Sequence, residues 1–352
     1  WYQRNFSDPQ AVNLLLFLLF GFLIVLFMGE MLAPALASIV IAYMLEAVVI
    51  MLVNRSMPRL VAVSLVCLVF FFSLLAFILL MVPVLSHQVT QLVQELPNQI
   101  DRGQQSVLML PDRYPELVSE SQIKEIMSEI RGQIAKLGQD ILSISLASIP
   151  ILFALMIYLV LVPLLVFLFL KDKVILLNWF KGYLPQQRNL ANQVWKEMDE
   201  QIGNYVRGKF TEILIVGGVT YLGFVILGLN YAALLAVLVG ISVIVPYIGA
   251  AVVTVPVAMI AYFQWGWTAN FAYLMAVYGI IQAIDGNVIV PLLFSEAVNL
   301  HPTAIILAVL VFGGLWGLWG VFFAIPLATL VKAVLNAWPS KKGNDQPEPE
   351  GA

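Results

Sequence analysis

The amino-acid sequence predicts an all-α membrane protein that crosses the bilayer several times. Of its 352 residues, 61% are hydrophobic and only 11% are charged, whereas a soluble domain carries about 25% charged residues. Its mean hydropathy is +0.93. Several apolar runs reach the length of about 20 residues that a helix needs to span a bilayer. The net charge of −3 gives no reason to expect a nucleic-acid partner.

Six apolar runs are candidates for complete spans, and two more are interrupted by glycine and proline. Gly29-Glu30 joins the first two runs directly, which predicts a transmembrane hairpin rather than a cleaved signal peptide. We expect about six full spans, with the interrupted stretches Tyr231–Phe263 and Thr303–Leu335 either re-entering the bilayer or crossing it, which would give eight spans. The complete candidates are Ala11–Met28, Met31–Val53, Leu60–Val84, Leu146–Leu170, Thr211–Leu229 and Phe271–Val290.

The distribution of lysine and arginine predicts the orientation of these spans. The segment Lys171–Lys209 carries seven basic residues, whereas Ser86–Ser145 carries five basic and eight acidic ones. Because cytoplasmic loops are enriched in basic residues, both termini and the first segment are expected in the cytoplasm and the second outside. The predicted divisions are residues 1–85 (first three spans), 86–145 (outer helical segment), 146–170 (fourth span), 171–210 (cytoplasmic amphipathic helices), 211–338 (transport core) and 339–352 (disordered tail).

Both extramembrane segments show helical periodicity. The outer segment carries apolar residues at alternating steps of four and three, which is a heptad seam. This seam packs either within one subunit or between the subunits of a homo-oligomer. The inner segment carries an apolar stripe at Leu190, Val194, Met198, Ile202, Tyr205 and Phe210. The residues of the seam are Ile123, Met127, Ile130, Ile134, Leu137, Ile141 and Ile144.

Several kinds of chemistry are not expected. Gly203–Lys209 has the glycine and lysine spacing of a phosphate-binding loop, but Phe210 stands where the loop needs Ser or Thr, and no strand precedes it. The two histidines, His87 and His301, are far apart and form no zinc motif. No paired aspartates or serine-nucleophile turn suggests intramembrane proteolysis. The sequence therefore predicts neither an enzyme nor a bound cofactor or metal.

The two interrupted stretches resemble each other. The pentamer LAVLV occurs at Leu235–Val239 and again at Leu307–Val311. Each copy is followed by a glycine-bearing break, and each break is followed by an apolar arm with a proline, Pro256 or Pro326. A twelve-residue arm is about 18 Å long, which is less than the hydrocarbon thickness of about 30 Å. Together with the span between them, these stretches predict an inverted repeat of one span and one re-entrant hairpin, which is typical of a transporter's binding site.

Asp285 lies near the inner end of the span that links the two interrupted stretches. An ionisable group inside a span usually marks an ion or substrate path, although Asp285 could instead reach the interface or cap a helix end. Glu296 and His301 are weaker candidates for ion coupling or gating, and Glu46 is expected to pair with Arg55 or Arg59. The candidate substrate path contains Pro246, Tyr247, Gly249, Asn287, Pro291, Gly313, Gly314, Trp316, Gly317, Gly320 and Pro326.

Four segments resemble the autoinducer-2 exporter-like transporter family. They are QVWKEMDEQIGNYVRGK at Gln193–Lys209, VPYIGA at Val245–Ala250, DGNVIVPLLFSEAVNLHP at Asp285–Pro302 and GLWGVFFAIPLA at Gly317–Ala328. The resemblance covers the whole chain apart from the tail. It implies a bacterial inner-membrane protein, a pentamer and an elevator-like, proton-coupled mechanism. Some members export autoinducer-2, and others are proposed to be cation–proton antiporters.

The residues and the resemblance together predict a secondary transporter, namely a proton-coupled exporter of a small polar solute. Asp285 is the expected coupling or gating carboxylate, and the partners are the lipid bilayer, the solute and protons or another cation. The alternatives are a cation–proton antiporter, a passive oligomeric channel and a membrane scaffold that carries nothing.

Overall fold

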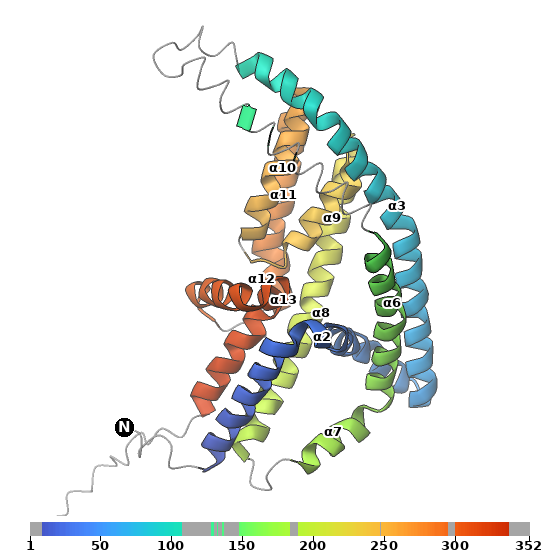
Figure 1. Cartoon of the computed structure of the whole chain (residues 1–352), viewed down its shortest axis with the longest axis vertical. Coiled ribbons are helices and arrows are strands. Elements are labelled where there is room, and N and C mark those ends of the chain that lie inside the picture. Colours follow the sequence, from blue (N-terminus) through green and yellow to red (C-terminus); the bar gives the residue numbers. More distant parts are fainter. Residues whose placement is uncertain are drawn as a thin grey trace, which may run out of the picture.

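The computed structural model describes residues 9–107, 128–129, 132, 136, 148–183, 189–246, 248–294 and 300–337, and those residues contain helices but no strand. Seven of these helical segments are long and apolar enough to cross a membrane. The prediction of an all-α, multi-pass membrane protein is therefore confirmed. In chain order the helices are α2 (Pro9–Val53), α3 (Arg59–Val107), α6 (Ser148–Lys171), α7 (Lys173–Gly182), α8 (Asn189–Ile226), α9 (Ala232–Ser242), α10 (Ile248–Trp265), α11 (Ala269–Ile284), the π-helix η1 (Asp285–Ile289), α12 (Val290–Phe294) and α13 (Pro302–Ala337) (Figure 1).

The turn predicted at Gly29-Glu30 is absent, because both apolar runs belong to the single helix α2, but each run remains long and apolar enough to cross a membrane by itself. Neither residue stops a helix by itself, and continuing the helix satisfies the backbone hydrogen bonds that a turn in an apolar region would expose. A straight helix of 45 residues would be about 68 Å long. Instead, α2 bends (Figure 1), and Pro34 lies inside it, which is the usual cause of a kink.

The predicted inner segment and the following span are likewise one helix, α8, which begins at Asn189. Val194, Met198 and Tyr205 of the predicted stripe are buried, whereas Phe210 is exposed. Val194 and Met198 pack with Leu14 of α2 and Ala333 of α13. The beginning of α2, the beginning of α8 and the end of α13 therefore lie together, at the lower end of the molecule in Figure 1. This is the arrangement expected when both termini and the inner segment share one side.

The apolar core forms several clusters, the two largest of which lie in different regions, while α2 packs into clusters of both. One, which we call the N-terminal bundle, consists of α2, α3 and α6, packed around Val49, Val63 and Val166. The other, which we call the C-terminal core, consists of α8 to α13, and its largest cluster contains Phe224, Leu235, Leu274 and Tyr278. Contacts of α2 with α8 and of α3 with α9 join the two regions.

Both interrupted stretches fold back sharply at glycine. A Cβ atom on Gly249 would overlap the carbonyl oxygen of Ser242, and one on Gly320 would overlap the carbonyl oxygen of Phe312. In α13 the bend is at Gly317, whose φ of 57° and ψ of −134° suit only glycine. From the first stretch to the second, the contacted carbonyl residue moves by 70 positions (Ser242 to Phe312) and the glycine by 71 (Gly249 to Gly320). The two prolines are a similar distance apart in sequence. The two stretches thus share the local geometry that their sequence similarity predicts.

Candidate functional site

Asp285 begins a π-helical turn in the middle of an otherwise continuous helical segment. Helix α11 ends at Ile284, η1 covers Asp285–Ile289, and α12 continues from Val290. A π-turn inserts an extra residue into the helical ladder, and such turns are frequent at functional sites. Only 8% of Asp285 is exposed, so its carboxylate faces the protein.

The carboxylate of Asp285 is incompletely satisfied. Its Oδ1 atom is buried and accepts no hydrogen bond from the residues that the structure describes. The π-helix η1 that carries it packs against α8, the helix of Lys209 and Glu212. A buried carboxylate without a full set of donors is costly in its ionised form, so this site favours either a proton or a compensating cation.

Lys209 and Glu212 form an ion pair that is closed off from solvent. The distance from Lys209 Nζ to Glu212 Oε2 is 2.7 Å, and the side chains are 5% and 3% exposed. The same Nζ donates a hydrogen bond of 2.6 Å to the carbonyl oxygen of Val243, at the end of α9. It also lies 5.3 Å from the centre of the Phe294 ring. Lys209 therefore joins α8, the first break and α12.

Small residues let these elements approach closely enough for Lys209 to reach its partners. A Cβ atom on Gly240 of α9 would lie 3.2 Å from the Cα of Gly217 on α8. One on Gly208 would lie 2.9 Å from the ring of Phe294. Glycine at these positions brings α8 against both α9 and α12, as small residues do in membrane helix packing.

The structure brings the two breaks together beside this site. Val245, in the first break, packs against Ala308, Val309 and Ala324 from both arms of α13. Pro246 is half-buried and Gly249 is buried next to it. In the second break, Trp316 stacks on Phe312 at 6.0 Å and contacts Phe22 of α2 at 4.9 Å. Its indole nitrogen is buried, with no hydrogen-bond partner among the described residues.

Other predicted site residues are exposed, lie along α13 or have local hydrogen-bond partners. His301 is exposed, and its Nδ1 accepts a hydrogen bond from the backbone N–H of Thr303 at the start of α13. Asn287 is exposed and donates to the carbonyl of Ala283 in its own helix. Gly313 and Gly320 lie along α13, while Gly314 and Gly317 are exposed there and Pro291 is exposed on α12. Pro326 is buried, and its carbonyl accepts a bond from Thr329.

Some predicted residues lie outside the described part of the chain. They are Tyr247, Glu296 and every member of the heptad seam, namely Ile123, Met127, Ile130, Ile134, Leu137, Ile141 and Ile144.

Sequence reasoning missed Lys209 and Glu212. Lys209 was grouped with the basic residues of the cytoplasmic segment, and Glu212 was not singled out. The available signal was a lysine and a glutamate three residues apart at the beginning of an apolar run, which places both on one face of a helix. That face is buried because α9 packs against it, a contact between segments that the local pattern does not reveal.

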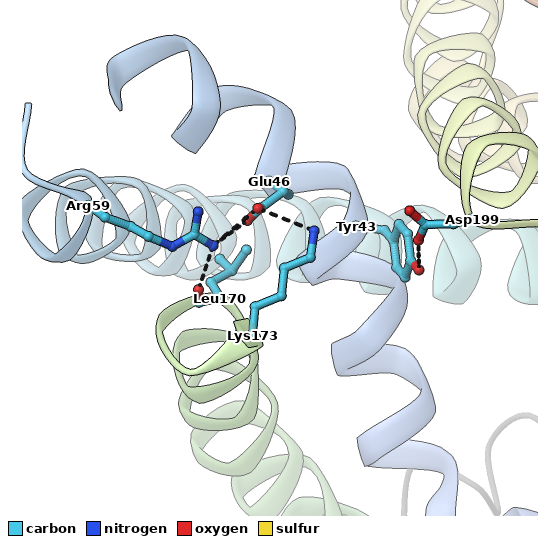
Figure 2. Close-up of polar contacts among 6 residues, drawn as sticks. All are labelled: Tyr43, Glu46, Arg59, Leu170, Lys173 and Asp199. Carbon is cyan, nitrogen blue, oxygen red and sulfur yellow. Dashed lines mark hydrogen bonds and ion pairs between the residues drawn. The ribbon is translucent and has the colours of Figure 1, made fainter. Parts of the chain in front are cut away.

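A second buried carboxylate, Glu46, lies in the N-terminal bundle and has a complete set of partners. Arg59 donates to it at 3.1 Å, as predicted, and Lys173 of α7 donates at 3.3 Å. Arg59 also donates to the carbonyl of Leu170 at 3.0 Å, so that Glu46 ties α2 to α3, α6 and α7 (Figure 2). Nearby, the Tyr43 hydroxyl donates to Asp199 of α8. This second contact joins the bundle to the core (Figure 2).

A cavity of about 200 Å³ lies elsewhere, between α3 and the core. It does not include Asp285, and its polar groups include Glu95 and Tyr231, which share a hydrogen bond of 2.7 Å. Its lining consists of Leu92, Glu95, Asn230, Tyr231, Pro256, Met259, Ile260, Phe263 and Gln264.

Comparison with known proteins agrees with this architecture. A family model described as "AI-2E family transporter" matches residues 15–340. The chain belongs to the AI-2E family of transporters. It is 50% identical to the protein named "Putative permease PerM" of Escherichia coli strain K12, over 96% of both chains. It is 28% identical to the protein named "Putative transport protein YueF" of Bacillus subtilis strain 168, over 88% of this chain and 84% of that one. The resemblance to this AI-2E family is thus confirmed, and with it the assignment as a membrane transporter.

Proposed function

We propose that the protein is a secondary transporter of the bacterial inner membrane that exports a small polar solute in exchange for protons. Asp285 is the coupling carboxylate. Autoinducer-2-like signalling molecules are the first solutes to test, because the family is named for such export. Both termini are cytoplasmic, and the two folded-back stretches are re-entrant hairpins of an inverted repeat.

The observation that carries this proposal is the unsatisfied Asp285 on a π-helical turn. A structural carboxylate in an apolar region is normally paired and hydrogen-bonded, whereas one that must take up and release a proton cannot be fully neutralised by fixed partners. Asp285 also belongs to the span between the two hairpins. Movement of either hairpin would therefore change its surroundings.

An elevator-like movement of the C-terminal core is supported by the separate apolar cluster of α2, α3 and α6. Only α2 of these three helices also packs into the clusters of α8 and α13. Several polar contacts between the two regions would have to change. Among them are the bond of Tyr43 with Asp199, the bond from the Leu234 N–H to Gln88 and the bond of Tyr231 with Glu95. A homo-oligomer, pentameric as the family resemblance implies, would hold the bundle still while the core moves.

The test uses the purified full chain in liposomes with a pH-sensitive dye inside. Candidate polar metabolites, including autoinducer-2, are added to the wild type, to Asp285→Asn and to the control Glu200→Gln, which changes an exposed carboxylate of α8. We expect saturable, solute-dependent proton movement in the wild type and the control, and its loss in Asp285→Asn.

The other outcomes separate the alternatives. Equal, non-saturable solute flux in all three proteins without a proton signal would indicate a passive channel. Proton movement driven by a cation gradient without any solute would indicate a cation–proton antiporter. If folded oligomers of the wild type carry neither solute nor protons, the result would favour a membrane scaffold.

A further inference from the structure

The surroundings of the Lys209 ammonium group have the composition of a cation site. A carboxylate from Glu212, the carbonyl oxygen of Val243 and the face of the Phe294 ring all approach it. Each of these groups attracts positive charge. Val243 follows directly after α9, so its carbonyl belongs to the negative end of a short helix, which also favours a cation.

Transporters built on broken helices hold their coupling cation in comparable surroundings, where carbonyl oxygens at half-helix ends meet side-chain ligands. In this chain the ammonium group of Lys209 occupies the corresponding position, beside the Val243 carbonyl at the end of α9. Its two hydrogen bonds, of 2.7 and 2.6 Å, are in the short range of charge-assisted bonds. A Na⁺ ion cannot occupy the same position while the ammonium group is there.

We propose that Lys209 is a permanently tethered cation that replaces a coupling metal ion, so that the ion exchanged at this site is a proton and not Na⁺. The proposal rests on the proposed coupled transport. The charged groups here are the paired Lys209 and Glu212 of α8 and Asp285 of η1, which packs against α8. The nearby Tyr205 hydroxyl is occupied in donating to the Phe322 carbonyl at 2.7 Å.

The charges of Lys209, Glu212 and Asp285 determine how many protons the site binds in each transport cycle. One ammonium and two carboxylates carry a net charge of −1, and a single proton on either carboxylate makes the cluster neutral. Neutrality is strongly favoured in apolar surroundings. The tethered lysine therefore predicts one proton bound per transport cycle, shared between Glu212 and Asp285 as a coupled pair of sites.

Chemical rescue tests the site without relying on transport. Lys209→Ala removes three carbons and the ammonium group, which propylammonium replaces. We expect the thermal unfolding midpoint of purified Lys209→Ala to rise with propylammonium concentration and to saturate. The midpoints of the wild type and of Lys196→Ala, which lacks an exposed lysine of the same helix, should not respond. No rise in Lys209→Ala, or an equal rise in the control, would overturn the proposal.

A second measurement needs neither a variant nor a known solute. The wild-type midpoint is compared in NaCl, KCl and N-methylglucamine chloride of equal ionic strength. Equal midpoints support a site already filled by lysine, whereas a saturable rise specific to Na⁺ contradicts it. In liposomes, proton-coupled flux should be unchanged when Na⁺ is replaced by N-methylglucamine. If that flux needs Na⁺, the tethered-cation proposal fails while transport itself stands.

Discussion

Glu46 and Asp285 are both buried carboxylates in apolar helices, yet their surroundings differ. They are 9% and 8% exposed. Glu46 is held by two cationic side chains within 3.3 Å (Figure 2), whereas Asp285 has one buried oxygen with no described hydrogen-bond donor. Burial alone therefore does not distinguish a structural carboxylate from a functional one. The completeness of its partners does.

The backbone around the two carboxylates differs in the same way. Glu46 lies in the continuous helix α2, among helices that run unbroken through the N-terminal bundle. Asp285 lies on a π-turn between two stretches that fold back at glycine. Irregular backbone inside a membrane protein is tolerated only where protein or a water-filled cavity satisfies it. The C-terminal core thus concentrates the features that make movement and ion binding possible.

The largest effect is expected at the glycines of the two folded-back stretches. Gly249→Ala and Gly320→Ala each place a methyl group on a backbone carbonyl oxygen, which the chain can relieve only by moving the backbone. We expect each to cost about 3 kcal/mol or more, seen as a lower unfolding midpoint and loss of flux. Gly218→Ala on α8 is the matched control, since its new methyl group meets nothing within 4 Å. Equal stability of all three variants would show that the fold-back is not needed.

The second-largest effect is expected on the stability of variants of the two buried carboxylates. Glu46→Gln leaves Arg59 and Lys173 without their counter-charge, and because these side chains are 38% and 40% exposed we expect a loss of about 1–2 kcal/mol. Asp285→Asn removes an unsatisfied charge, so its stability should be unchanged or higher. Denaturant or thermal unfolding of the purified proteins measures both. A destabilised Asp285→Asn with an unaffected Glu46→Gln would reverse our assignment of the two roles.

The sequence was sufficient for the features that depend on local pattern. Apolar run length predicted the helices, and the LAVLV repeat with its glycines and prolines predicted two similar breaks. Asp285 stood out as a charge in an apolar run. Glu46 was matched with Arg55 or Arg59, the cations nearest to it in sequence, and the structure pairs it with Arg59. Each of these inferences needs only neighbouring residues.

Features that depend on contacts between distant segments could not be predicted. The burial of Lys209 follows from the approach of α9 to α8, which brings the Val243 carbonyl within 2.6 Å of it. Lys173 reaches Glu46 only because α7 starts at the end of α6, which packs against α2. The turn wrongly predicted at Gly29-Glu30 has a different cause. Glycine and glutamate are compatible with a helix, and only the packing around them decides between a turn and a continuous helix.

The smallest effect on stability is expected at Tyr43, where the N-terminal bundle contacts the C-terminal core. The Tyr43 hydroxyl of α2 donates to Asp199 of α8, and Tyr43→Phe removes this bond while keeping the ring. We expect a loss of about 1 kcal/mol in stability. If the core moves against the bundle during transport, the bond must break in each cycle, and the variant should transport solute at an equal or higher rate. Tyr183→Phe, at an exposed tyrosine after α7, is the control. A slower rate in Tyr43→Phe alone would mean that the contact is kept during transport, so that α2 and α8 move together and the moving boundary lies between α2 and the rest of the bundle.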